Sequence, residues 1–365
     1  MTEEKKALDR YLSPLDVWSM AFGCMVGWGV FAMPGNTFLP VAGPAGTVIA
    51  MGIGMVIMLI IGANFSYLMG RTAITGGVYS YTKDAFGRDH AFLSSWFLCL
   101  SYLTIVFLNG TALFYVVRTL FGDSLQGSFH YTIAGNPIYP GETVLSVLVL
   151  SGVGILFIKA KAILQKLLIL SIVAAAFAYA AMTLVSVATV PDGFSSWQAY
   201  ISGLGSLKGV DSIPTFHAAR AIMGNFGLVV MAVTAVAAIL TGIIGGYRAT
   251  TRVLSTMAED RILSKKFSRT TYSILFIMII AILLSFLGRN TLNWFVDLTS
   301  FGAIVGFGYT SAAAWKIART EGNKRIFITG LIGTIISVVF VLVQLIPHLA
   351  AMEAMGSEAF LLLAF

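Results

Sequence analysis

Residues 14–35 read PLDVWSMAFGCMVGWGVFAMPG, an apolar stretch interrupted by Gly23, Gly27 and Gly29. Its length is close to the roughly 20 apolar residues that cross a bilayer as a helix. A helix inside a membrane breaks only where its freed N–H and C=O groups meet protein, water or a ligand. A broken span offers amide N–H groups to a carboxylate, and carbonyl oxygens to an ammonium group or a cation. The spacing of Gly23 and Gly27 also fits a close-packing notch between helices, so both interpretations stay open.

The whole chain has the composition of a membrane protein. Of its 365 residues, 58% are hydrophobic and 11% are charged, whereas about 25% of the residues of a soluble domain are charged. We find no soluble domain or linker, and we expect one membrane domain over residues 1–365. Nine apolar segments are long enough to cross a bilayer, or nearly so, and they cover residues 15–39, 44–69, 91–121, 142–160, 163–190, 221–247, 271–288, 292–316 and 326–349.

The distribution of lysine and arginine predicts the orientation of these segments. With the N-terminus in the cytoplasm, only Arg118, Lys208, Arg220 and Arg289 of the 23 basic residues fall in outer stretches. Cytoplasmic loops carry an excess of Lys and Arg, so we expect a multi-pass protein with a cytoplasmic N-terminus. The net charge of +7 then reflects topology and contact with anionic lipid in the bilayer. No basic cluster is interleaved with exposed aromatic residues, and we predict no nucleic-acid partner.

Four motifs in order resemble one family of membrane proteins. Gly23–Phe31 (GCMVGWGVF) resembles the first-helix signature of the amino acid–polyamine–organocation superfamily, which contains the amino-acid permeases. Thr75–Tyr81 (TGGVYSY) resembles the loop between its second and third helices, and Arg252–Asp260 (RVLSTMAED) the loop after its eighth. Asp297–Gly302 (DLTSFG) resembles the start of its tenth helix. The resemblance covers nearly the whole chain.

This resemblance implies an all-α membrane helix bundle with an inverted repeat of five plus five helices, of which the first and sixth are broken. It implies a secondary active transporter of amino acids or related amines in the cell's inner (plasma) membrane, driven by protons, sodium or exchange. No other cofactor is expected. The residues implied to hold the substrate are those around the first break: Gly23, Cys24, Met25, Val26, Gly27, Trp28 and Gly29.

The chain departs from the family pattern in its length. Residues 191–220 are too polar to span, and nothing there resembles the sixth and seventh helices of the family. We therefore expect an outward-facing connection in place of a helical hairpin, and a fold that is incomplete by two helices. The apolar tail from Glu358 is too short to cross, which predicts that most of a twelfth helix is missing too. A permease-like membrane protein that does not transport, such as a remnant, a sensor or an assembly partner, is the alternative to a transporter.

Trp28 stands where the family usually has a small residue beside the substrate. Its ring either stacks on an amine or aromatic substrate or packs against helices and the membrane interface.

Three further residues are candidates for binding a coupling ion. Some proton-coupled relatives carry a lysine in the fifth helix, and Lys166 matches it by one alignment, whereas another alignment places Ile172 there. The position of Lys166 near the cytoplasmic end favours a charge anchor. Thr234 and Thr241 have hydroxyls suited to sodium, although bonding to their own helix is the simpler interpretation.

The remaining polar and small residues are interpreted structurally. Glu142 opens its segment, where an acidic side chain favours the helix dipole. Gly302 and Gly306 form a small-residue notch of the kind that packs helices closely. The chain has no H-E-x-x-H zinc motif, Walker A sequence or G-x-S-x-G nucleophile motif, so we predict neither a metal site nor an enzyme.

Overall fold

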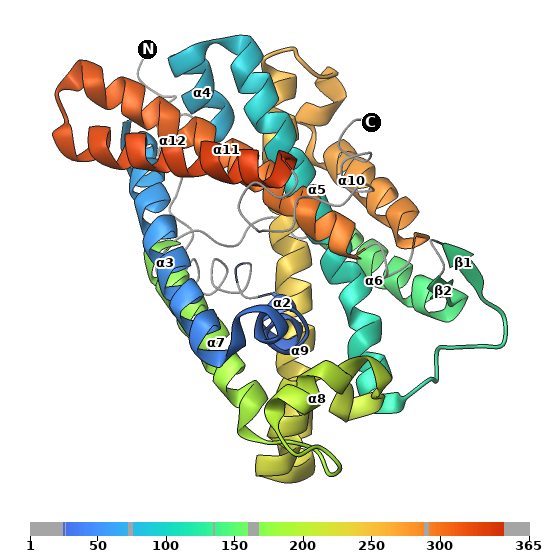
Figure 1. Ribbon diagram of the computed structural model, residues 1–365. Helices are drawn as coiled ribbons and strands as arrows, with labels where there is room; N and C mark the ends of the chain where they lie inside the picture. Colours follow the sequence, from blue (N-terminus) through green and yellow to red (C-terminus); the bar gives the residue numbers. More distant parts are fainter. Residues whose placement is uncertain are drawn as a thin grey trace. The chain divides into compact units, whose positions relative to one another are not determined.

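The computed structural model describes Met25 and residues 27–71, 76–133, 136–159, 168–287 and 292–346. Over these ranges the chain is helical almost throughout (Figure 1), which confirms the all-α class expected from the sequence. The chain forms two compact units. The first unit contains residues 1–55 and 156–242, and the second contains residues 56–155 and 243–365.

The helices match the predicted apolar segments within a few residues at most ends. Five helical stretches in the described part are long and apolar enough to cross a membrane: Gly29–Arg71, Arg88–Phe121, Pro140–Ile158, Pro214–Glu259 and Lys324–Leu345. The α-helices are α2 (Gly29–Met33), α3 (Leu39–Arg71), α4 (Val78–Phe86), α5 (Arg88–Phe121), α6 (Pro140–Lys159), α7 (Leu168–Ala188), α8 (Trp197–Gly203), α9 (Pro214–Glu259), α10 (Thr270–Ser285), α11 (Leu292–Glu321) and α12 (Lys324–Leu345).

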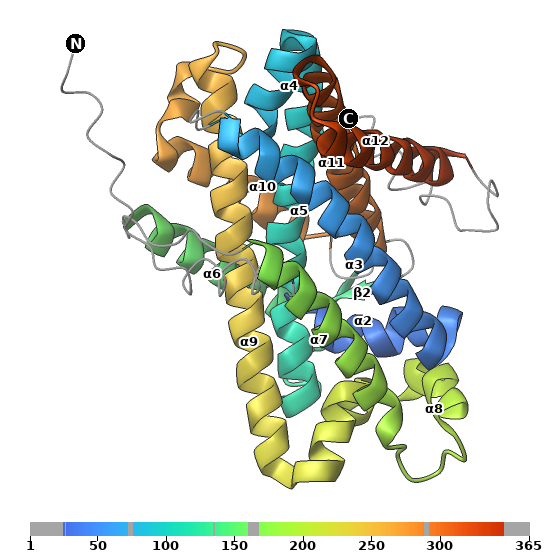
Figure 2. The same ribbon diagram turned by 90° about the vertical axis from the view of Figure 1, so that its left-hand side faces the viewer.

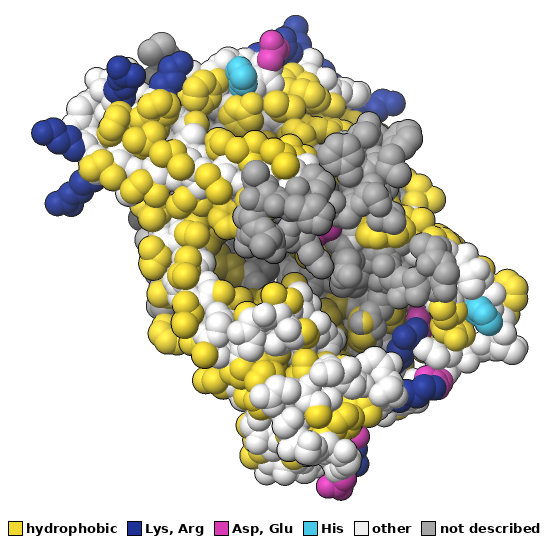
Figure 3. Space-filling view, in the orientation of Figure 1, with side chains coloured by type: hydrophobic (Ala, Val, Ile, Leu, Met, Phe, Trp, Pro, Cys, Tyr) yellow, Lys and Arg dark blue, Asp and Glu magenta, His cyan; other side chains and the backbone are white. Residues whose placement is uncertain are grey.

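Apolar side chains lie open on the outside of these helices. Val41, Leu148, Phe226 and Ile335 are each more than half exposed. Figure 3 shows hydrophobic side chains on the visible face of α11 and α12, with Lys and Arg gathered at the turn between these helices. Water disfavours such apolar surfaces and lipid accepts them, so the chain is a multi-pass membrane protein.

Two glycines bend long helices of the first unit. Gly43 has a φ of 64° inside α3, directly before Pro44, and Gly224 has a φ of 63° inside α9. Glycine adopts positive φ readily, whereas other residues are strained there. The bend in α9 is plain in Figure 2, where the first turns of the helix leave the axis of the rest.

The second unit is held by close contacts of α11 with α5. The rings of Phe107 and Phe295 lie 4.5 Å apart at their centres. A Cβ atom at Gly302 would collide with the backbone carbonyl of Phe97 on α5, and one at Gly306 would come within 3.0 Å of Leu98. The two glycines therefore allow close approach, which confirms the packing interpretation of this notch.

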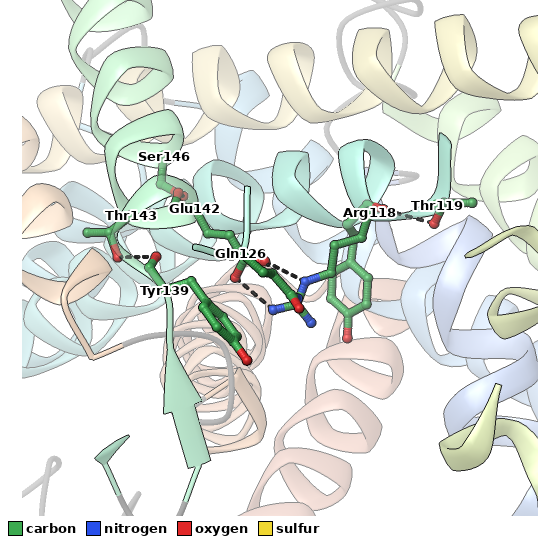
Figure 4. A network of polar contacts seen from close by, with 8 residues as sticks. Arg118, Thr119, Gln126, Tyr139, Glu142, Thr143 and Ser146 are labelled. Atoms are coloured by element: carbon green, nitrogen blue, oxygen red, sulfur yellow. Dashed lines mark hydrogen bonds and ion pairs between the residues drawn. The ribbon is translucent and has the colours of Figure 1, made fainter. Parts of the chain in front are cut away.

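A partly buried ion pair joins α5 to the start of α6. Arg118 donates to both carboxylate oxygens of Glu142, at 2.5 and 2.7 Å, and the Glu142 side chain is 6% exposed. Figure 4 shows this pair beside Gln126, whose side-chain oxygen, when turned toward the guanidinium, accepts from Arg118 at 2.7 and 3.0 Å. Glu142 is therefore more than the helix-dipole residue that the sequence predicted, because its buried carboxylate also pairs with Arg118, whose side chain is partly exposed.

Three local structures differ from the sequence prediction. Residues 78–86 form the helix α4, where the family resemblance implied a loop between the second and third helices. Residues 252–259 continue α9, where it implied the loop after the eighth helix. The connection between α5 and α6 contains a small antiparallel hairpin of β1 (Tyr131–Ile133) and β2 (Asn136–Ile138), which periodicity did not reveal. Residues 191–213 contain α8 and two 3₁₀ turns, whereas residues 214–220, the last part of the connection predicted over 191–220, already belong to α9.

Candidate functional site

The first helix is broken at Gly27. This residue has a φ of 48° and lies in a turn, and α2 begins only at Gly29 with Trp28 as its N-cap. In the described structure no side chain caps this helix start. The first amides of a helix have no acceptor within the helix, so the N–H groups of Gly29 and Val30 are without a partner in α2. The break expected from the glycine pattern is therefore confirmed.

A widened turn follows directly after the break. Residues 34–38 are π-helical, and the amide of Leu39 donates to the carbonyl of Pro34, five residues back. Pro34 has no N–H, so it cannot donate to the carbonyl of Val30 as an α-helical residue would. Single π-helical turns inside helices occur frequently at functional sites. Some amides and carbonyls of this short stretch therefore lack the partner that a regular α-helix would give them. They lie at the break and at the widened turn.

Tyr179 of α7 lies against this stretch. A Cβ atom built on Gly29 would stand 2.8 Å from the Tyr179 hydroxyl oxygen. The ring of Tyr179 also lies 6.1 Å from the ring of Phe38 in the widened turn. The hydroxyl is therefore next to the backbone at the start of α2.

The start of α9 contacts the same stretch from another side. The hydroxyl of Thr215 donates to the carbonyl of Phe31 at 2.7 Å, and the Thr215 side chain is fully buried. Pro214 occupies the space beside Gly35, where a Cβ atom would come within 2.6 Å of the Pro214 Cγ. The start of α9 is thus joined to α2 by a hydrogen bond and to the widened turn by a close packing contact.

Trp28 is buried, with 8% of its surface exposed. Its ring centre lies 6.5 Å from that of Phe31, at an angle of 42° between the ring planes. This arrangement favours the packing interpretation of Trp28 over stacking on a substrate.

The sequence-predicted site residues have different outcomes. The structure brings Gly27, Trp28 and Gly29 together at the break, and Met25 lies just before it in helical conformation. Gly23, Cys24, Val26 and Lys166 lie outside the described residues. The hydroxyl of Thr234 donates to Val230 of its own helix at 2.7 Å, and that of Thr241 to Ala237 at 2.9 Å, as the simpler interpretation of these threonines expected.

Sequence reasoning missed Tyr179 and Thr215. Tyr179 is the only tyrosine in the mostly apolar segment 163–190, and this was the available signal. Thr215 follows a proline that starts a helix, a position typical of a helix N-terminus rather than of a binding site.

A second polar cluster lies in the second unit, where α9 ends. Asp260 accepts hydrogen bonds from the hydroxyl of Tyr79 and from Lys83 at 2.6 Å, and its backbone carbonyl accepts from Arg88 at 2.8 Å. The hydrogen bond from Lys83, followed by that from Tyr79, lowers the pKa of Asp260 below its ordinary value. Burial, followed by the hydrogen bond to Asp260, raises the pKa of Tyr79. The cluster fastens α4 to the end of α9.

Comparison with protein families gives one match that covers most of the chain. The family model described as amino acid permease matches residues 12–165 and 155–357.

Curated relatives align with shorter stretches of the chain. A methylthioribose transporter of Bacillus subtilis (strain 168) is 34% identical over 102 residues, which are 27% of this chain and 22% of the relative. A putative arginine/ornithine antiporter of Escherichia coli (strain K12) is 36% identical over 117 residues, 29% of this chain and 25% of the relative. Human cationic amino acid transporter 4 is 33% identical over 97 residues, 27% of this chain and 15% of the relative. The matched stretch is thus a quarter or less of each relative.

Proposed function

The chain belongs to the amino acid permease family, and from this premise we propose that it is a secondary active transporter of amino acids or related amines. One observation carries the proposal: the first helix opens at Gly27 and is followed by the widened turn at residues 34–38. The names of the relatives support the substrate class, since they include transporters of cationic amino acids and of arginine and ornithine.

The chemistry of the break suits a zwitterion. The amides of Gly29 and Val30 lie at the positive end of a helix dipole, which favours a carboxylate. Carbonyls that lack their helical donor, such as that of Val30, favour an ammonium group. The hydroxyl of Tyr179 lies beside Gly29 at the same place.

We place the protein in the cytoplasmic (inner) membrane with its N-terminus in the cytoplasm, because 19 of the 23 basic residues then face inward. A proton gradient, a sodium gradient or exchange supplies the driving force. Lys166 is the candidate for a proton site, and Thr234 and Thr241 are the candidates for a sodium site. The protein carries its substrate without chemical change, so it is not an enzyme.

Uptake into proteoliposomes tests the proposal. The purified chain is reconstituted, and each proteinogenic amino acid is offered in radiolabelled form under an inward pH gradient, an inward sodium gradient or with amino acid trapped inside. We expect saturable uptake of at least one amino acid above that of protein-free liposomes, in response to one of the three conditions. Uptake equal to the protein-free level in every combination contradicts transport.

One observation favours the alternative, a permease-like protein that does not transport. Between Ala188 and Pro214 the described chain has one seven-residue helix and two 3₁₀ turns, whereas a span needs roughly 20 residues. The second broken helix that the family resemblance implies is therefore not found in this interval. Under this alternative, the reconstituted protein binds a radiolabelled amino acid in equilibrium dialysis but moves none across the bilayer.

A further inference from the structure

A small polar network holds together the segment that connects α7 to the start of α9. The Tyr200 hydroxyl donates to the carbonyl of Asp211 at 2.7 Å, and the Asp211 carboxylate lies 2.8 Å from Nδ1 of His217. The rings of Tyr200 and His217 meet edge to face, with centres 5.7 Å apart, and Tyr200 is fully buried. Because His217 lies in the first turn of α9, this network ties α8 to the start of that helix.

The same helix start is the part that contacts the broken first helix. Thr215 donates to the carbonyl of Phe31, and Pro214 lies beside Gly35 with no space for a larger residue there. The Thr215 hydroxyl therefore bonds to a segment outside its own helix, in contrast to the hydroxyl of Thr250 in the same helix. The buried Thr250 hydroxyl donates only four residues back, to Gly246, at 2.8 Å.

A buried carbonyl without a donor is costly, and a single buried hydrogen bond of this kind is worth about a tenfold change in an equilibrium. The carbonyl of Phe31 belongs to the stretch in which Pro34 already removes one helical donor. Loss of the Thr215 hydroxyl would therefore remove the hydrogen bond that joins the start of α9 to α2, directly before the widened turn.

We propose that the connecting segment 197–217 holds the broken first helix in its open geometry, and that Thr215 is the positioning residue through which it acts. The proposal rests on the proposed function in one respect, namely that the open geometry is the one that binds the amino acid. Thr215 touches the backbone that forms the site and not the substrate. The connection and the start of α9 thus support the site from outside the first helix.

Hydrogen–deuterium exchange of the purified full chain tests this directly, since it needs no substrate. In Thr215→Val, amides of peptides covering residues 31–39 should exchange roughly tenfold faster than in the wild type. Thr215→Ser keeps the hydroxyl and should exchange like the wild type. The matched control Thr250→Val loses a buried hydroxyl of the same helix and should leave these peptides unchanged. Equal exchange in folded Thr215→Val and wild type overturns the proposal, and so does equal acceleration in Thr215→Ser or Thr250→Val.

A second variant covers the case in which Thr215→Val does not fold. Gly35→Ala places a methyl group on Pro214 and displaces the helix start while the Thr215 hydroxyl is kept. It should accelerate the same peptides, and unchanged exchange in folded Gly35→Ala overturns the proposal.

Uptake measurements separate this proposal from the proposed function. Thr215→Val should raise the KM for the amino acid about tenfold, while Thr250→Val leaves the KM unchanged. A wild-type protein without any uptake contradicts the transport function, whereas the exchange result still decides the role of Thr215.

Discussion

Replacing Gly29 with alanine puts a methyl group against the hydroxyl of Tyr179. The new Cβ atom would stand 2.8 Å from the hydroxyl oxygen and 3.0 Å from the sulfur of Met33, where ordinary contacts begin at 3.4 Å. The hydroxyl oxygen is the end of the packed Tyr179 side chain, so this side chain must shift by about half an ångström to accept the methyl group. Overpacking of this kind costs about 1–3 kcal/mol. Because Met33 is flexible, we assign most of this cost to Tyr179.

Removal of the hydroxyl should relieve the strain. In Gly29→Ala/Tyr179→Phe the nearest atom is the Met33 sulfur, and alanine also favours the helix over glycine by up to about 1 kcal/mol. We therefore expect a coupling free energy of about 1–2 kcal/mol between the two changes, in the direction of rescue. The control Gly52→Ala lies in α3 with no atom within 4 Å of the new Cβ, and it should not destabilise.

The assay is unfolding in mixed micelles of increasing denaturing detergent, from which the free energy of unfolding of each variant is obtained. Uptake of the wild type, Gly29→Ala, Tyr179→Phe and the double variant is measured in parallel, and Gly29→Ala should lower kcat/KM about tenfold, in line with the loss of about 1.4 kcal/mol. Additive effects of the two changes, with coupling below about 0.3 kcal/mol, would refute the contact between Gly29 and Tyr179.

Three further predictions concern the second unit. Asp260→Asn should lower the free energy of unfolding by about 1 kcal/mol at pH 7. The pKa of Asp260 is depressed, so its contribution is present above the ordinary Asp pKa and fades as the pH falls through the lowered value. Acid unfolding curves of variant and wild type should therefore merge once the pH is below that lowered pKa. Arg118→Gln should cost more than Glu142→Gln, about 3 against about 2 kcal/mol, because the first leaves a carboxylate that is 6% exposed without its partner; the reverse order in thermal unfolding would contradict this. Gly302→Ala should lower the melting temperature by several degrees, since its methyl group meets the rigid carbonyl of Phe97, and an unchanged melting temperature would show that α5 and α11 separate freely.

The spanning helices were predictable because apolar length is a property of each segment by itself. The segment expected over 44–69 is α3 after its bend at Gly43, and the segment expected over 326–349 is α12 at Lys324–Leu345. The break at Gly27 was predictable for a similar reason, since glycine is the residue that adopts a positive φ without strain.

The contacts that complete the candidate site were not predictable from one sequence. Thr215 and Phe31 are 184 residues apart in the chain, and no local pattern says which helix start will meet which carbonyl. Helix α4 was missed because it is only nine residues long. The pairing of Arg118 with Glu142 was missed because each residue, taken alone, is explained as a charge at a helix end.

Uptake by Gly27→Leu tests the central claim, that the opened first helix handles the amino acid, more directly than any other measurement. Leucine is strained at a φ of 48°, at a cost of about 1–3 kcal/mol, and its side chain would cover the amides of the break. We expect reconstituted Gly27→Leu to be folded and to lose saturable amino-acid uptake, while Gly52→Leu, on the open face of α3, retains it. Wild-type uptake by a folded Gly27→Leu would contradict the account.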